Sequence, residues 1–166
     1  MSRSFSGSAD STATVDEILA AFGRKDYWVA RLATGDAVTT LDSLVAHADG
    51  TVSVHFTQYL GRQLLPAMVA RLLPGDLTME YAETWTPEDA RVRGQIDAVA
   101  SGGLGSCGAT ASLTPIATGS QLRFDGSVKV KIPLVGGNLE KSIGADLARN
   151  MPSVLRFTTT WIEEQA

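Results

Sequence analysis

The chain is poor in the residues that build covalent cross-links and metal centres. Its 166 residues include one cysteine, Cys107, and two histidines, His47 and His55. A single cysteine cannot form an intramolecular disulfide bond, and a lone thiol is typical of a reducing cytoplasm. Because a structural zinc site uses about four cysteine or histidine ligands, we expect no metal site and no cofactor.

Long apolar runs and a surplus of positive charge are also absent. No stretch approaches the roughly 18 apolar residues of a membrane span, and the first ten residues lack the apolar segment of a signal peptide. The net charge at pH 7 is −4, and the lysines and arginines are scattered along the chain. We therefore expect a cytoplasmic protein that binds no nucleic acid and does not insert stably into a membrane.

Helical patterns occur near both ends of what we expect to be one domain, 1–166. Thr14 and Glu17 form a capping-box pattern ahead of "VDEILAAF", and Gly23 is placed to end that helix in a left-handed conformation. A second short helix is predicted from Asp26 to near Gly35. Apolar residues at helical spacing predict one long helix over about 137–164, capped by Asn138 or Gly137.

Between these helices the chain alternates apolar and polar residues, which predicts antiparallel strands. A first strand is expected around Phe5. The six others are predicted at 36–48, 51–59, 76–86, 91–101, 106–117 and 120–132.

The expected turns predict which side chains share a face of the sheet. A two-residue turn at Asp49-Gly50 places Val45 and His47 on the inner face and His55 on the outer one, so the two histidines do not share a metal. The remaining hairpins pair Trp85 with Val92, Ala100 with Cys107 and Leu113 with Phe124. The same turns place five basic residues together on the outer face: Arg91, Arg93, Arg123, Lys129 and Lys131.

Residues 103–108, "GLGSCG", match the glycine pattern of a dinucleotide-binding loop. Such a loop requires a following helix, whose N-terminus holds the pyrophosphate. Here the alternation of "SCGATASLT" predicts a strand instead. We interpret the glycines as a hairpin turn.

Several segments of the chain resemble a known superfamily. The order of elements is similar to the START-like or SRPBCC superfamily, which includes lipid-transfer domains, the birch-pollen allergen and polyketide cyclases. A bacterial START-like family of unknown function is resembled more closely, through "FGRKDYWVARL", "TTLDSL", "LLPAMVARLLPGDL", "ETWTP" and "LRFDGSVKVKIPLVGGNLE". The resemblance implies an α+β helix-grip fold, in which a curved seven-stranded antiparallel sheet surrounds the long C-terminal helix and an apolar cavity lies between them.

Small inward residues in the middle of the sheet, among them Gly94, Ala98 and Gly126, either leave space for a ligand or let the long helix pack closely. The inward positions that we expect to line a cavity are Phe56, Gln58, Met79, Tyr81, Glu83, Ile96, Phe124, Ile143, Leu147, Met151 and Trp161.

Glu83 is the charged exception on this inner face, where an unpaired carboxylate is costly. It either forms the polar contact of a ligand site together with Tyr81 and Gln58, or it is solvated or paired with an arginine.

The stretch 64–73 carries a broad apolar stripe after a proline suited to a first helical turn. It is either a helix packed over an open end of the core, or a movable lid or membrane- or subunit-contacting patch. The lid residues would be Leu65, Met68, Val69 and Leu72.

Taken together, the residues and the resemblance favour a module that binds a hydrophobic small molecule or lipid without covalent chemistry. Two alternatives stay open, namely a cyclase- or hydrolase-like enzyme using Glu83 and Tyr81, and a regulatory interaction module whose cavity is filled.

Overall fold

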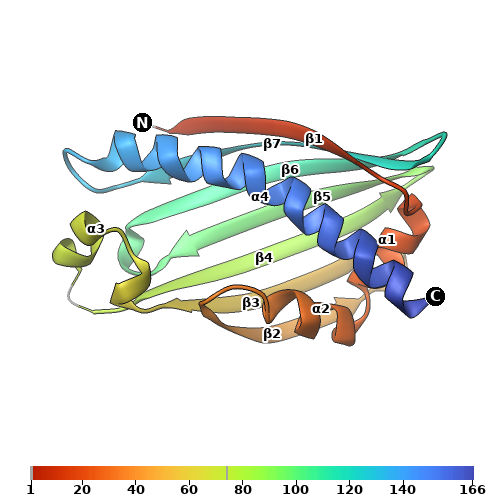
Figure 1. The fold of residues 1–166 in the computed structure, drawn as a ribbon, viewed down its shortest axis with the longest axis horizontal. Coiled ribbons are helices and arrows are strands. Elements are labelled where there is room, and N and C mark those ends of the chain that lie inside the picture. The colour runs from red at the N-terminus through yellow and green to blue at the C-terminus, as the bar shows by residue number, and fades with distance from the viewer. Residues whose placement is uncertain (1, 74) are drawn as a thin grey trace.

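The computed structural model describes residues 2–73 and 75–166, and it shows one antiparallel sheet with a long helix lying diagonally across one face (Figure 1). The elements are β1 (Arg3–Ser11), α1 (Val15–Phe22), α2 (Lys25–Leu32), β2 (Val38–Ala46), β3 (Val52–Leu60), α3 (Ala67–Leu72), β4 (Leu77–Glu88), β5 (Arg91–Ala100), β6 (Gly105–Ile116), β7 (Gly119–Val130) and α4 (Gly136–Gln165). The helix-grip fold is therefore confirmed, and the ends of β2 to β7 lie within two residues of their predicted positions.

The capping box that the sequence predicts is present at the start of α1. The Thr14 hydroxyl accepts a hydrogen bond from the Glu17 amide at 3.1 Å, and the Glu17 carboxylate accepts one from the Thr14 amide at 2.9 Å. The prediction for Gly23 is wrong, because its φ of −84° is right-handed. Arg24 directly afterwards is already the N-cap of α2, so the chain has no room for a left-handed closing turn.

The start of α4 depends on a glutamate rather than on a capping side chain. Neither Asn138 nor Gly137 caps the helix, which begins after Val135 without a side-chain cap. Instead the buried Glu140 carboxylate accepts a hydrogen bond from the Val130 amide at 2.9 Å. This bond fixes the first turn of α4 to the end of β7.

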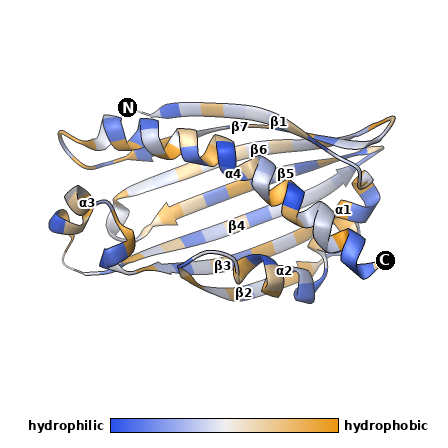
Figure 2. Cartoon of the chain, viewed as in Figure 1, coloured by the Kyte–Doolittle hydropathy of each residue, from blue (hydrophilic) through white to orange (hydrophobic). Residues whose placement is uncertain are grey.

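The sheet has seven strands in the order β1-β7-β6-β5-β4-β3-β2. In three hairpins the register differs by two residues from the prediction, so that Trp85 opposes Gly94, Ala98 opposes Cys107 and Leu113 opposes Leu122. A shift of two residues keeps every side chain on its predicted face, since the side-chain period of a strand is two. The alternation of hydrophobic and hydrophilic residues along the strands is visible in Figure 2, and the five basic residues predicted for the outer face are exposed.

The hairpin between β2 and β3 shows a one-residue error in the prediction. His47 pairs with Thr51 across a three-residue loop in which Gly50 has a φ of +91°, so the predicted two-residue turn is wrong. The odd shift turns Val45 outward, where it is 45% exposed, and a further irregularity follows between Leu41 and Ser43. His47 therefore lies on the outer face with His55, and its ring bonds Ser53 at 3.0 Å.

The main core lies where α1, α2 and the C-terminal half of α4 meet the sheet (Figure 1). Ile18, Tyr27 and Trp28 are fully buried there. The Trp28 indole donates to the Phe22 carbonyl at 2.6 Å, which ties α2 to α1. A second, smaller cluster around Val69, Leu73 and Ile132 lies at the opposite end of the sheet, beside α3.

No helix within residues 2–73 and 75–166 is both long enough and apolar enough to cross a membrane.

Candidate functional site

The inner face of the sheet, which α4 crosses, divides into a packed half and a half-exposed half. Contacts of α4 with the sheet fall chiefly on β1 and β7, and its C-terminal end packs on α1. In Figure 1 the ribbon of α4 leaves uncovered the parts of β4 and β5 that lie toward α3. Of the predicted cavity residues, Phe56, Phe124 and Trp161 belong to the packed core.

Glu83 lies in the packed half and is paired with Arg31 of α2. The Arg31 guanidinium donates to one carboxylate oxygen at 2.9 Å, and the Trp85 indole donates to the other at 3.0 Å. Only 3% of the Glu83 side chain and 15% of the Arg31 side chain are exposed. The structure thus brings Glu83 to an arginine and not to Tyr81 and Gln58.

Two aromatic residues of α2 complete the surroundings of this ion pair. The Arg31 guanidinium lies 4.4 Å from the centre of the Trp28 ring, and the Tyr27 hydroxyl lies 2.6 Å from the Thr158 hydroxyl. Burial raises the pKa of Tyr27 above its ordinary value. Burial alone would lower the pKa of Arg31, but the Glu83 carboxylate and Tyr27 together outweigh this effect and raise that pKa. The network therefore holds a permanent positive charge inside the core.

Sequence reasoning did not single out Arg31, although a signal for it exists. Arg31 follows Tyr27 by four residues, and residues at that spacing share one face of a helix. An arginine on the same face as a buried tyrosine indicates a buried partner of opposite charge.

Tyr81 and Gln58 contact each other one step farther along the same face. The Tyr81 hydroxyl donates to the Gln58 side-chain oxygen at 3.1 Å, and the Tyr81 ring stacks on Phe56 with 4.8 Å between centroids. Burial is the main cause that raises the pKa of Tyr81, with smaller contributions from Cys107 and Glu83. The pair presents a neutral polar group beside apolar surface.

Tyr81 also belongs to a set of side chains on β4, β5, β6 and α4 that are apolar or aromatic and only half-buried. We call this set the inner apolar patch, and its members are Met79, Tyr81, Ile96, Cys107, Leu147 and Met151. Ile143, one turn before Leu147 on α4, is 37% exposed. Because these residues point to the same side as the core yet stay half-accessible, α4 does not seal this part of the sheet.

A small enclosed space lies between the patch and the ion pair. Its volume is about 20 Å³, and its lining includes Arg31, Ile96, Met151 and Thr158. This suffices for about one water molecule and is far below the roughly 300–1,000 Å³ of small-molecule sites. The small residues of the sheet do not create a large void beside Glu83, because the Trp85 ring lies over Gly94 and the Phe5 ring over Gly126.

The predicted lid segment forms helix α3 at the end of the sheet. Val69 is buried in the second cluster, Leu65 packs against that cluster and Leu72 is 58% exposed. The side chain of Met68 lies outside the described residues. This placement fits a helix packed over the end of the core, and movement of α3 as a lid stays a prediction.

Cys107 offers a chemical test of the accessibility of the patch. Burial, followed by the charge of Asp97, raises the pKa of its thiol, and alkylation requires the thiolate. We expect iodoacetamide to modify Cys107 in the folded protein with a pH midpoint above that of an unstructured cysteine peptide. Mass spectrometry of timed samples between pH 7 and 10 measures this midpoint, and the urea-unfolded protein should match the peptide. A midpoint in the folded protein equal to that of the peptide would contradict the half-buried placement.

Among residues 2–73 and 75–166, no three histidine, cysteine or acidic side chains gather closely enough to hold a metal ion. Apart from the buried Glu83–Arg31 ion pair, the chemistry of this face is that of an apolar surface with the neutral Tyr81–Gln58 pair.

The architecture is the START-like, helix-grip fold, which several solved structures share. Similar chains include a protein of Thermus thermophilus, TTHA0849 (TM-score 0.61, 14% identity, 99% of both chains), and Ara h 8.0201 (0.59, 10%, 99% of both). A START superfamily protein of Mycobacterium smegmatis is similar as well (0.53, 13%, 99% of both).

At the level of sequence, the match is to a family without an assigned activity. The profile described as protein of unknown function (DUF2505) matches residues 6–162, and the chain belongs to this family. The uncharacterized protein Rv0481c of Mycobacterium tuberculosis is 37% identical over 171 residues, which cover 98% of each chain. Mb0491c of Mycobacterium bovis, also described as uncharacterized, matches equally well.

Proposed function

We propose that this protein binds a hydrophobic small molecule or lipid on the inner apolar patch, between β4–β6 and the N-terminal half of α4. The observation that carries the proposal is the half-buried state of the six patch residues on the face that α4 crosses. On the same face Phe56, Trp85 and Phe124 are buried in the core, whereas five of the patch residues are only partly buried against it.

The energetic basis is the removal of apolar surface from water, worth about 25 cal/mol per Å². An apolar ligand lying on Met79, Ile96 and Leu147 would cover surface that the chain leaves exposed. The Tyr81–Gln58 pair is the polar group beside this surface, and it would orient a ligand that carries one hydroxyl or carbonyl group.

The enzyme alternative receives less support from the same geometry. Glu83 accepts hydrogen bonds from both Arg31 and Trp85, so each of its carboxylate oxygens is engaged in the fold. Tyr81, with its pKa raised, holds its proton at neutral pH and donates it to Gln58. A general base or nucleophile would need a free lone pair facing the substrate.

A bulky side chain in the patch should block binding. Cys107→Trp fills the patch from β6, whereas Ser106→Trp places the same indole on the outer face. We expect Cys107→Trp to weaken the affinity for Nile red, a neutral apolar dye, by about tenfold or more, corresponding to about 1.4 kcal/mol. Ser106→Trp should leave it unchanged. Fluorescence titration measures both, and circular dichroism verifies that each variant is folded.

Equal Nile red affinities in the two folded variants would argue against the patch as the binding surface. If the unmodified protein showed no saturable binding of Nile red, the proposed function itself would be contradicted.

A further inference from the structure

The outer face of the sheet, opposite to the one that α4 crosses, carries a depression of about 620 Å³ across β1, β7, β6 and β5. This volume falls in the range of small-molecule sites, roughly 300–1,000 Å³. Three arginines line it, Arg91, Arg93 and Arg123, although the chain as a whole is acidic. The depression is thus a basic hollow on an acidic protein.

The strand register places hydroxyl groups and arginines in one alternating row across this hollow. Directly opposed residues on β4, β5, β6, β7 and β1 are, in order, Thr86, Arg93, Ser112, Arg123 and Ser8. Neighbouring strands lie 4.7–4.9 Å apart, so the backbones of Arg93 and Arg123 are roughly 10 Å apart with Ser112 between them. Both guanidinium groups can therefore reach an anion seated over the Ser112 hydroxyl.

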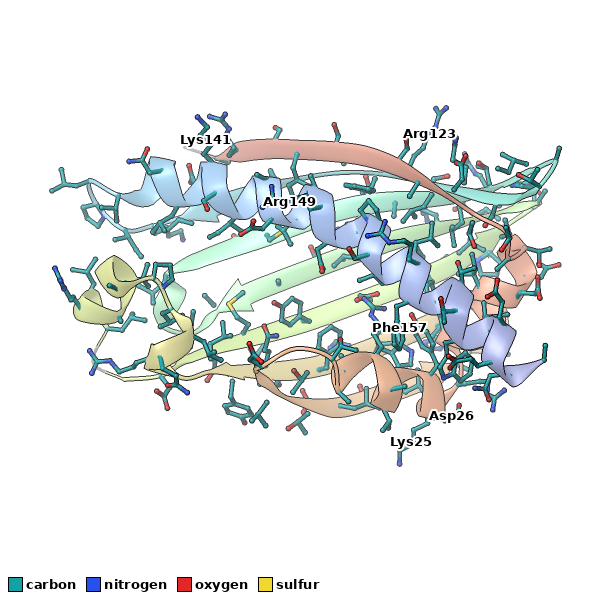
Figure 3. The ribbon with its side chains drawn as sticks, in the orientation of Figure 1. Lys25, Asp26, Arg123, Lys141, Arg149 and Phe157 are labelled. Carbon is teal, nitrogen blue, oxygen red and sulfur yellow. The ribbon has the colours of Figure 1, made fainter. Side chains whose placement is uncertain are left out.

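The two arginines of the row retain free donors. Arg93 is bonded to Glu88 at 3.1 Å, an exposed ion pair of the kind that is worth about 0–1 kcal/mol. Arg123 donates through Nε to the neutral Gln121 side chain at 3.0 Å, and its terminal nitrogens pair with no carboxylate among the described residues. In Figure 3 the Arg123 side chain extends clear of the ribbon. Asp125 lies one row farther along the same face, opposite Thr110 and Ser6, so an anion is favoured on the arginine side of the hollow.

We propose that the row Arg93–Ser112–Arg123 binds the phosphate group of a small molecule. A phosphate group presents three terminal oxygens in a tetrahedral arrangement. This arrangement matches the Arg93 and Arg123 guanidinium groups on two sides and the Ser112 hydroxyl between them. A carboxylate presents two oxygens in one plane. A second hollow of about 410 Å³ adjoins the first through Thr110 and Asp125, and it provides room for the polar remainder of such a molecule.

This site is independent of the inner apolar patch, because the two lie on opposite faces of the sheet. A neutral apolar dye tests the patch and an inorganic anion tests the row, so the failure of one proposal does not imply the failure of the other.

The test is a titration of the isotopically labelled protein with sodium phosphate at pH 7.5, followed by NMR at constant ionic strength. We expect saturable shifts of the backbone amides of Arg93, Ser112 and Arg123. The double substitution Arg93→Gln with Arg123→Gln should weaken the apparent phosphate affinity by about tenfold or more. Lys129→Gln, which removes an exposed charge from the same face of β7, should change it less than about twofold.

Three results would overturn the proposal. One is a set of shifts that sodium chloride reproduces, which would show only ionic screening. Another is an unchanged phosphate affinity in the double variant. Because both substitutions are at exposed positions, we expect this variant to be folded, with an unfolding temperature close to that of the unmodified protein. The third is acetate binding as tightly as phosphate, which would assign the row to carboxylates.

Discussion

Replacing Arg31 with methionine is expected to destabilise the fold by about 3–5 kcal/mol. The substitution keeps most of the side-chain volume but leaves the Glu83 carboxylate, 3% exposed, without its charged partner. The remaining hydrogen bond from Trp85 does not neutralise the charge. Urea denaturation of the variant and of the unmodified protein at pH 7 measures the difference in the free energy of unfolding.

The chain supplies a matched control on the same helix. Arg24 pairs with Asp26 at 2.7 Å, but both side chains are more than half exposed, so Arg24→Met should cost about 0–1 kcal/mol. The double substitution Arg31→Met with Glu83→Leu should recover much of the lost stability, because it removes the unpaired charge. A cost of Arg31→Met within about 1 kcal/mol of the Arg24→Met cost would show that the buried pair is not a structural requirement.

Replacing Gly94 with valine is expected to cost about 3 kcal/mol, although valine ordinarily favours strands. A Cβ atom at this position would lie near the six-membered ring of Trp85, within van der Waals overlap. That ring cannot move aside, because it packs on Phe22 with 4.8 Å between centroids and its indole nitrogen bonds Glu83. The added methyl groups therefore displace the central aromatic cluster. Thermal unfolding followed by circular dichroism measures the loss.

Gly108→Val on the adjacent strand is the control for this substitution. A Cβ atom there meets the Asp97 carboxylate at 3.3 Å, the far end of a side chain on the outer face. We expect Gly108→Val to be within about 1 kcal/mol of the unmodified protein. If the two valine variants were equally stable, close packing of Trp85 on Gly94 could not be the reason for a glycine on β5.

The face of each strand residue in β4 to β7 was predictable, whereas the cross-strand partner was not. Alternation decides the face locally, but the partner depends on how many residues the turn uses. Between β4 and β5 the sequence suggested a four-residue turn, while Glu88 opposes Arg91 directly, which leaves Asp89 and Ala90 as the turn. Asp89 adopts a φ of +56°, a conformation that aspartate accepts more readily than most residues. Only for β2 did the miscount change the faces.

The candidate site was predictable as a region but not as a set of contacts. Phe56, Tyr81 and Ile96 were correctly placed on the inner face by their period. Their division into packed core and half-buried patch depends on the course of α4, which no local pattern encodes. An arginine partner for Glu83 was one of the alternatives, but Arg31, which is 52 residues away in the chain, was not identified as that partner. Long-range pairing of this kind follows from tertiary packing alone.

The two apolar clusters lie at opposite ends of the sheet, and the two ends differ in the free energy needed to separate the helices from the sheet. The end containing Tyr27, Trp28 and the Arg31–Glu83 pair is joined by aromatic contacts and hydrogen bonds among three helices. The end beside α3 depends on a few aliphatic contacts around Val69 and Ile132. Local fluctuations begin where fewest buried contacts must separate. Separation of α3 from the sheet should therefore cost less free energy than global unfolding, so amide hydrogens of α3 should exchange with solvent while those of the aromatic end stay protected.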